Sequence, residues 1–244
     1  MKMKPETFVS VDIETSGPIP GEYSMLSLGA CIVGDPALNF YREFRPNADK
    51  FIPEALAVSG LQISKLNQSG TDPKQGMQEF KDWIETNSRG RRPVFAAFNA
   101  PFDWSFLNYY FHFYLGANPF GFSALDMKAF FMGLTGCTWD DTRSSRISEI
   151  LNAETEIKHN ALEDALAQAR LFEKMRFLAK GNLLQDLTEY SRMKTDHPTC
   201  YIPLDLPFYA HLQDDGVRAI LLWTECYYVL ANTTAFGRSG ESHA

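Results

Sequence analysis

The sequence predicts an α/β fold in which helices flank a mixed central sheet. Short apolar runs typical of strands dominate the N-terminal part of the chain, and farther along a strand-like run alternates with segments of helical periodicity. With 45% apolar and 22% charged residues among 244, the composition is that of a globular protein with a sizeable core. Strands first, followed by strands alternating with helices, indicate a layered α/β arrangement.

The strand predictions depend on short apolar or alternating runs. The run at 8–13 ends in acidic residues, and the run at 39–45 alternates apolar with polar residues, as expected at a sheet edge or in a hairpin. A short buried strand is expected directly after Pro93. The strands are expected at residues 8–13, 25–33, 39–45 and 94–98.

The helix predictions depend on apolar residues that recur at helical spacing. The segment 160–180 gives the clearest pattern, and Asn160 with Glu163 has the spacing of a capping box, so Asn160 is expected as the N-cap. Gly60 is expected to close a short helix. The helices are expected at residues 53–58, 73–86, 101–115, 144–151 and 160–180.

Charge and cysteine usage limit the class of protein. A net charge of −7 argues against a protein that coats long duplex DNA through a basic face, but it is compatible with an enzyme that grips a short nucleic-acid end. The four cysteines form no C-x-x-C pair, so a structural zinc site is not expected. Scattered cysteines, no apolar signal-peptide core and no apolar run long enough to span a bilayer predict a cytoplasmic protein without a membrane partner.

The chain is expected to hold one main domain and an extension. Residues 1–181 form the main domain, and residues 182–244 are predicted to be a C-terminal extension that packs on it. Residues 196–207 contain three prolines and indicate an extended connection, whereas 217–230 could form an amphipathic helix. The tail 237–244 is expected to be disordered.

Two carboxylates stand at the end of the first expected strand. Asp12 and Glu14 are alternate residues, and alternate residues of a strand point to the same face of a sheet. Side by side, the two acids repel one another and raise each other's pKa. A cation between them would turn that repulsion into a binding site. The pair is common by chance, however, and by itself it more often marks a polar strand end before a turn.

Two further segments carry residues suited to the same chemistry. Asp103 follows a buried strand and lies in the first turn of an expected helix, where an acid also favours the helix dipole. His159 precedes the helix capped by Asn160, and Asp164 lies in its opening turns, so both can border one pocket. Each segment alone is better explained as an ordinary helix start.

The order of these residues along the chain, together with their neighbours, indicates a protein family more specifically than any single motif does. The motifs are Asp12-Ile13-Glu14-Thr15 followed by Gly17, Leu28-Gly29-Ala30, Asn99-Ala100-x-Phe102-Asp103 and His159-x-Ala161-x-x-Asp164-Ala165. Together they resemble the DEDDh group of DnaQ-like 3′→5′ exonucleases, a branch of the ribonuclease H-like fold. The resemblance covers roughly residues 7–178.

Two positions depart from the pattern of that family. Phe98 stands where the family often has His, and Ser27 stands where it often has an acid. Neither position is one of the five core catalytic residues. The departures therefore bear on substrate contacts and rate, and leave the reaction class unchanged.

The resemblance implies a ribonuclease H-like mixed central sheet flanked by helices, with residues 1–181 as an exonuclease domain. It assigns His159 as the general base, since an imidazole can accept a proton near neutral pH. Four carboxylates would hold two divalent cations, Mg²⁺ or Mn²⁺. The reaction would release nucleoside 5′-monophosphates from single-stranded nucleic-acid 3′ ends. The four carboxylates are Asp12, Glu14, Asp103 and Asp164.

Substrate contacts are expected on either side of these acids. By the same resemblance, the segment 15–17 approaches the terminal nucleotide and its 3′-hydroxyl. Phe102 and Trp104 flank Asp103 and could stack on a base, which contributes about 1–3 kcal/mol in any sequence. Core packing is the alternative explanation of both aromatic residues. The substrate-binding candidates are Thr15, Ser16, Gly17, Asn99, Phe102 and Trp104.

Several alternatives stay open from the sequence. The chain could be a proofreading subunit of a DNA polymerase, with residues 182–244 carrying the contact, or a binding module that keeps the fold without catalysis. Within the enzyme class it could trim RNA, like ribonuclease T or oligoribonuclease. Many relatives form dimers, so a homodimer is possible. The choice between DNA and RNA depends on how the pocket treats a 2′-hydroxyl, which motif spacing does not reveal.

Overall fold

The computed structural model describes residues 5–153 and 158–196, without the side chains of residues 182–196. The chain divides into two compact units, residues 1–175 and 176–244, and the sheet belongs to the first. The expectations for residues 197–244, including the extended connection, the amphipathic helix and the tail 237–244, lie outside the described residues.

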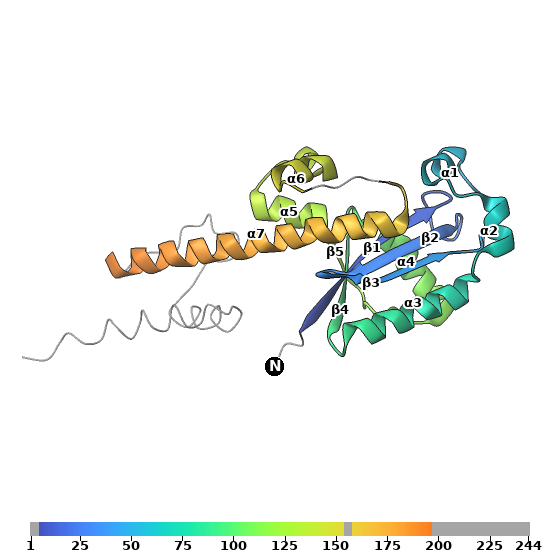
Figure 1. Cartoon of the computed structure of the whole chain (residues 1–244), viewed down its shortest axis with the longest axis horizontal. Helices are drawn as coiled ribbons and strands as arrows, with labels where there is room; N and C mark the ends of the chain where they lie inside the picture. The colour runs from blue at the N-terminus through green and yellow to red at the C-terminus, as the bar shows by residue number, and fades with distance from the viewer. Residues whose placement is uncertain (1–4, 154–157, 197–244) are drawn as a thin grey trace, which may run out of the picture. The chain divides into compact units, whose positions relative to one another are not determined.

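A mixed five-stranded sheet forms the centre of the first unit (Figure 1). Its strand order is β3-β2-β1-β4-β5. The pairs β1–β2 and β2–β3 are antiparallel, whereas β1–β4 and β4–β5 are parallel, so the expected mixed sheet is confirmed. The strands are β1 Glu6–Thr15, β2 Met25–Ile32, β3 Asp35–Glu43, β4 Arg92–Ala97 and β5 Ala124–Asp126.

Four elements were not expected from the sequence: α2, β5, α5 and a short 3₁₀ turn. Helix α2 has seven residues and one buried side chain, Leu66, so it carries almost no apolar pattern. Strand β5 has three residues, too few for an alternation to be recognised. The helices are α1 Pro53–Ser59, α2 Ile63–Ser69, α3 Pro73–Ser88, α4 Ala100–Leu115, α5 Met127–Thr135, α6 Ser144–Ile150 and α7 Ala161–Asp196, with a short 3₁₀ turn at Trp139–Thr142.

Strand β1 alternates between two faces of the sheet. Val9, Val11 and Ile13 belong to the larger core, which α3 and α4 cover with aromatic side chains such as Phe80 and Phe106. The alternate residues of β1 point to the other face, where α7 packs. Figure 1 shows α3 and the first part of α7 on opposite sides of the strands. The acidic pair of β1 therefore lies on the face covered by α7.

Small residues bring the start of α7 close to the sheet. Ala161, Ala165 and Ala169 are buried and recur every four residues, which places them on one face of the helix. At Gly29 of β2 an added Cβ would lie 2.2 Å from backbone atoms of Ala161. The carbonyl of Ala165 accepts a hydrogen bond from the Ser10 hydroxyl at 2.8 Å. The helix backbone therefore lies against the sheet, with no large side chain between them.

Helix α7 continues beyond its expected end at residue 180. It runs through Gly181 to Asp196, and the division between the two compact units falls between 175 and 176, inside this helix. A single glycine within a helix is unfavourable by only about 1 kcal/mol, so it need not end the helix. Over 5–153 and 158–196, no helix is long and apolar enough to cross a membrane.

Candidate active site

The carboxyl ends of β1 and β4 lie together, because the two strands are parallel neighbours. Asp12 and Glu14 lie near the C-terminal end of β1, and both side chains are half-buried. The cross-strand partner of Asp12 on β2 is Gly29. The expected pair of carboxylates on one face of a strand end is therefore present.

Asp103 reaches this strand end from α4. Its carboxylate accepts a hydrogen bond from the backbone N–H of Ile13 at 3.1 Å, so it lies directly beside the β1 backbone between Asp12 and Glu14. Its side chain is almost fully buried. Asn99 has a left-handed backbone with φ of 63°, which turns the chain sharply from β4 into α4. That turn places the first turn of α4 next to the end of β1.

The opening turn of α7 supplies Asp164 and His159. Asn160 is the N-cap as expected, since its Oδ1 accepts from the N–H groups of Leu162 at 3.1 Å and Glu163 at 3.2 Å. Asp164 Oδ1 accepts from the backbone N–H of Lys158 at 2.9 Å, which closes the loop in front of the helix. His159 is exposed and has a left-handed backbone, with φ of 53°.

The structure brings all five expected catalytic residues to one end of the sheet. Single ligand atoms of Glu14, His159 and Asp164 lie within 4.8 Å of one another. Asp12 and Asp103 are close enough to act electrostatically on each other. The five residues come from three segments that are far apart in the sequence, so only the fold assembles them.

Burial and the charges of neighbouring groups raise the pKa values of Asp12, Glu14 and Asp103. Burial raises the pKa of Asp12 well above its ordinary value, and three neighbouring carboxylates raise it further. These neighbours are Asp103, Glu14 and Asp164. Burial, followed by the charge of Asp164, raises the pKa of Glu14 from 4.5 to about 7. Burial raises the pKa of Asp103 to about 8, against the lowering effect of two backbone hydrogen bonds.

This group of acids suits a hard divalent cation. Carboxylate oxygens are the preferred ligands of Mg²⁺ and Mn²⁺, and a cation among them would offset the repulsion that raises their pKa values. Glu14, His159 and Asp164 present ligand atoms at a spacing that could hold such an ion. The residues present therefore fit a metal site, with Asp12 and Asp103 beside it.

Two residues that the sequence did not indicate act on this group: Gln168 through a hydrogen bond, and Asp126 through its charge, which adds to burial in raising the pKa of Asp103. Gln168 of α7 donates from Nε2 to Asp12 Oδ1 at 2.7 Å. Asp126, at the end of β5, accepts from the N–H of Ala100 at 2.7 Å and from the N–H of Ala129 at 2.7 Å. It thereby ties the start of α4 to the start of α5. Gln168 lies four residues after Asp164 on the same helix face, and that spacing was the available signal for it.

The segment 15–17 lies at the end of β1 as expected, with its side chains engaged inside the protein. Thr15 Oγ1 donates to the carbonyl of Gly17 at 2.9 Å. Ser16 is buried: its hydroxyl donates to the Lys50 carbonyl at 3.0 Å and accepts from the Ser24 N–H at 2.9 Å. These bonds fix the shape of the loop beside the acids. Whether the loop contacts a nucleotide stays a prediction.

The other substrate candidates surround Asp103 without pointing to one role. Asn99 is exposed, and its side chain makes no capping hydrogen bond to α4. Phe102 packs against Phe106, with 5.6 Å between ring centroids, and Trp104 meets Phe95 edge-on at 5.2 Å. Both aromatic side chains are half-buried against the larger core. Core packing is thus evident for both, and base stacking stays a prediction.

Comparison with known proteins identifies relatives of this chain. A family model described as the 3′-5′ exoribonuclease Rv2179c-like domain matches residues 7–176. The protein Cap18 of Escherichia coli, named a 3′-5′ DNA exonuclease, is 50% identical over 173 residues, which cover 70% of this chain and 92% of Cap18. This similarity to a named exonuclease argues against a binding module without catalysis.

Solved structures show the same fold at low sequence identity. The nuclease domain of 3′hExo, a DEDDh family member solved with rAMP, superposes with a TM-score of 0.59 at 14% identity, over 72% of this chain and 92% of that one. Exonuclease I of E. coli, solved with a dT13 oligonucleotide, gives a TM-score of 0.55 at 18% identity, over 78% and 44%. These likenesses confirm the expected ribonuclease H-like fold. Together with the family match and the relative that is 50% identical, they show that this chain belongs to the 3′-5′ exoribonuclease Rv2179c-like domain family and is a 3′-5′ exonuclease.

Proposed function

We propose that this exonuclease shortens single-stranded 3′ ends by hydrolysis at the five-residue site, with two divalent cations, Mg²⁺ or Mn²⁺. The observation that carries the proposal is the convergence of four carboxyl groups, three of them with a raised pKa, beside His159. Two cations would supply Lewis acidity at the scissile phosphate and at the attacking water. The ligands would be Asp12, Glu14, Asp103 and Asp164.

His159 is the proposed general base. It is exposed, so water reaches it, and one of its ring nitrogens lies within 4.8 Å of carboxylate oxygens of Glu14 and Asp164. The imidazole would take a proton from the attacking water at that nitrogen. The water oxygen would then bond to phosphorus as the P–O3′ bond breaks, the 3′ oxygen of the shortened strand would take up a proton, and a nucleoside 5′-monophosphate would leave. General-base catalysis of this kind typically contributes 10²–10⁴-fold in rate.

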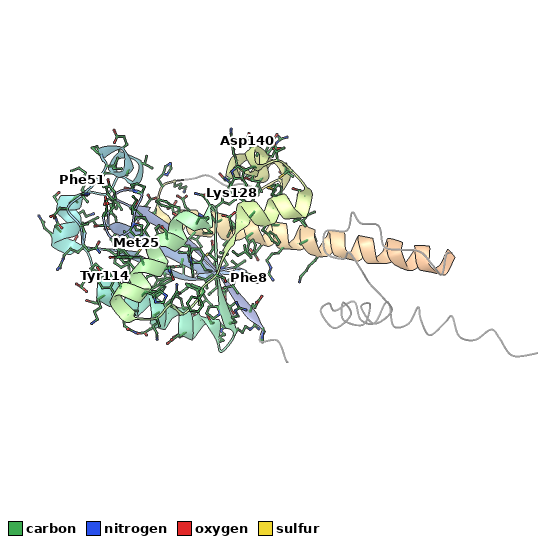
Figure 2. The ribbon with its side chains drawn as sticks, turned by 180° about the vertical axis from the view of Figure 1, so that it is seen from behind. Phe8, Met25, Phe51, Tyr114, Lys128 and Asp140 are labelled. Carbon is green, nitrogen blue, oxygen red and sulfur yellow. The ribbon has the colours of Figure 1, made fainter. Side chains whose placement is uncertain are left out.

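We propose that exposed apolar side chains beside the segment 15–17 form the binding surface for the terminal base, called the base seat below. The Ser16 carbonyl accepts from the N–H of Ile52 at 2.8 Å, which joins this segment to the start of α1. Around that junction, Ile19, Phe51 and Val58 are each about half exposed, at 52%, 51% and 53%. Figure 2 labels Phe51 near the two short helices α1 and α2. A base could pack on these side chains in any sequence, since every base has an apolar face.

DNA is the proposed preferred polymer. The relative that is 50% identical over nearly its whole length is named a DNA exonuclease, whereas the matching family model is described as an exoribonuclease. We give the name of this relative more weight, because 50% identity is a more specific similarity than a match to a description of the whole family. A digestion panel of single-stranded DNA, single-stranded RNA, duplexes and dinucleotides, each with Mg²⁺ and Mn²⁺, tests this choice.

The site itself is tested by two variants with matched controls. Asp12→Asn and His159→Ala should each lower kcat on a labelled single-stranded oligonucleotide by at least about 100-fold. The controls are Asp140→Asn, at an exposed acid labelled in Figure 2, and His112→Ala, at an exposed histidine of α4. Full activity of either site variant would remove that residue from the mechanism. EDTA should abolish the activity, and added Mn²⁺ should restore it.

The proposed base seat has its own test. Phe51→Ala should raise KM for the oligonucleotide several-fold, because the stacking surface is lost, and leave the metal requirement unchanged. Phe122→Ala is the control, since Phe122 is 92% exposed and precedes the start of β5, at the opposite end of the parallel strands from the acids. Equal KM values for Phe51→Ala and wild type would contradict the seat.

A further inference from the structure

The side chain of Gln168 connects three elements of the site. It lies on α7 four residues after Asp164. Its Nε2 donates to Asp12 Oδ1 of β1 at 2.7 Å. Its Oε1 accepts from the backbone N–H of Phe98, just after β4, at 2.9 Å. Both ends of one amide group are thus engaged, one with strand β1 and the other with the residue that follows β4.

The contact with Phe98 determines which way the amide faces. A backbone N–H can only donate, so the amide oxygen must point to Phe98 and the NH₂ group must point to Asp12. The orientation follows from the hydrogen-bond network and needs no choice between two flipped forms. Asp12 Oδ1 consequently faces a fixed donor, and its second oxygen, Oδ2, is left for another partner.

Asp12 differs from its neighbours in how its carboxylate is held. Asp103 and Asp164 accept hydrogen bonds from backbone N–H groups, those of Ile13 and Lys158. The corresponding bond to Asp12 comes from a side chain, that of Gln168. A substitution of Gln168 can therefore remove the hydrogen bond to Asp12 without changing the main chain of β1, which carries Asp12.

We infer that Gln168 is a positioning residue for the cation site: it fixes the Asp12 carboxylate through Oδ1, so that Oδ2 would be available as the metal ligand. This inference depends on the proposed function, in which Asp12 is a metal ligand. Partners that hydrogen-bond to a ligand orient it, and their removal typically weakens metal binding or activity 10–100-fold. Gln168 itself touches neither the metal nor the nucleic acid in this scheme.

The test measures Mn²⁺ binding by isothermal titration calorimetry with the full chain and no nucleic acid. Gln168→Met keeps the length and the helix propensity of the side chain but removes both hydrogen bonds. We expect its Mn²⁺ dissociation constant to rise about 10-fold or more. On an oligonucleotide, kcat at fixed Mn²⁺ should fall while KM for the oligonucleotide stays within about two-fold, because the base seat is untouched.

A second variant separates positioning from simple anchoring of α7. Gln168→Glu keeps an acceptor for the Phe98 N–H, but an ionised carboxylate cannot donate to Asp12 and repels it. If Gln168 only anchors the helix, this variant binds Mn²⁺ as tightly as wild type or more tightly, since the added negative charge attracts the cation, and the inference is overturned. If Gln168 positions Asp12, the variant also binds Mn²⁺ more weakly, because Asp12 turns away from a second carboxylate.

Two controls make the outcome specific. Gln78→Met removes a comparable hydrogen bond, from Gln78 Nε2 to Asp82 at 2.8 Å on the exposed face of α3, and should leave Mn²⁺ binding unchanged. Asp12→Asn tests the proposed function in the same assay. Unchanged Mn²⁺ binding in Asp12→Asn would remove the metal role of Asp12. Weaker binding in Asp12→Asn but not in either Gln168 variant would overturn only the role of Gln168.

Discussion

At the scale of single residues, burial raises the pKa values of two carboxyl groups of the site, so these groups bind protons more tightly than free acids do. Glu14 and Asp103 have folded-state pKa values raised to about 7 and about 8 by burial and by neighbouring charge. An acid whose pKa is raised on folding stabilises the fold in its protonated form. That stability is fully present below the unfolded pKa and is lost as the pH rises through the folded pKa.

The metal-free protein should therefore lose stability between about pH 5 and pH 8. Glu14→Gln removes one of the titrating groups, so its stability should fall less over this range and exceed that of wild type at pH 8 by on the order of 1 kcal/mol. Urea unfolding in EDTA at both pH values measures the difference. An identical pH dependence in the two proteins would show that Glu14 is not held as described. The same variant should have little exonuclease activity.

At the scale of elements, the first turn of α7 positions two of the five residues. Asn160 caps the helix through two backbone N–H groups, and His159 and Asp164 lie on either side of that cap. The arrangement of the site on this side therefore depends on how the helix begins. The spacing of Asn160 and Glu163 predicted the cap, although Glu163 pairs with Lys158 Nζ at 2.8 Å.

Removing the cap should affect stability and activity together. Asn160→Ala should lower the free energy of unfolding by about 1 kcal/mol, since N-cap substitutions by alanine typically have this effect. It should also lower kcat, because the loop that carries His159 is no longer held. Asn160→Ser keeps a capping oxygen and should recover most of both losses. Chemical denaturation and oligonucleotide digestion of the two variants check the pair of outcomes, and equal behaviour of the two would contradict it.

Elements with a clear apolar periodicity were predictable from the sequence. Short elements that form through pairing with a neighbouring strand were not. Strand β1 and the start of helix α7 show clear apolar periodicity and were expected close to their observed positions, whereas α7 ends later than its expected end at residue 180. Strand β5 exists because its three residues pair with β4, and α5 begins at once after it with Asp126 as N-cap. The spacing of Gln168 from Asp164 was the local signal for Gln168, but its bond to Asp12 joins segments far apart in the sequence, and so does the bond from Ala100 to Asp126.

At the scale of the whole molecule, the acids of the site contribute strongly to a net charge of −7. Cations that bind the folded protein but not the unfolded chain shift the unfolding equilibrium by mass action. Mn²⁺ at 100 times its dissociation constant should add about 2.7 kcal/mol of stability. At one fixed Mn²⁺ concentration the gain should be larger at pH 8 than at pH 5, since protons compete for the same carboxylates and raise the dissociation constant at the lower pH. Thermal unfolding with and without Mn²⁺ measures it, and an Asp140→Asn control should respond like wild type.

Catalysis is proposed to reside in residues 1–181. The five site residues lie within the first compact unit, and the family match ends at residue 176. A chain ending after residue 181 should keep its exonuclease activity on short single-stranded substrates, within a few-fold of the full chain. Loss of activity in a truncated chain that still shows a cooperative unfolding transition would instead assign residues 182–244 a part in the reaction. The comparisons do not support the polymerase contact or the homodimer that the sequence left open.

Gly29 has a consequence for how this site can vary. It lies opposite Asp12 in the sheet, and its missing side chain leaves the space in which the backbone of Ala161 rests. One hydrogen atom in place of a methyl group thus sets the gap between the strand that carries two acids and the helix that carries a third. Gly29→Ala would push the start of α7 away from the sheet and increase the distance between Asp164 and Asp12, although no acid is replaced. Such a mutation would lower activity by widening the gap between the sheet and α7, with no change in any of the five site residues.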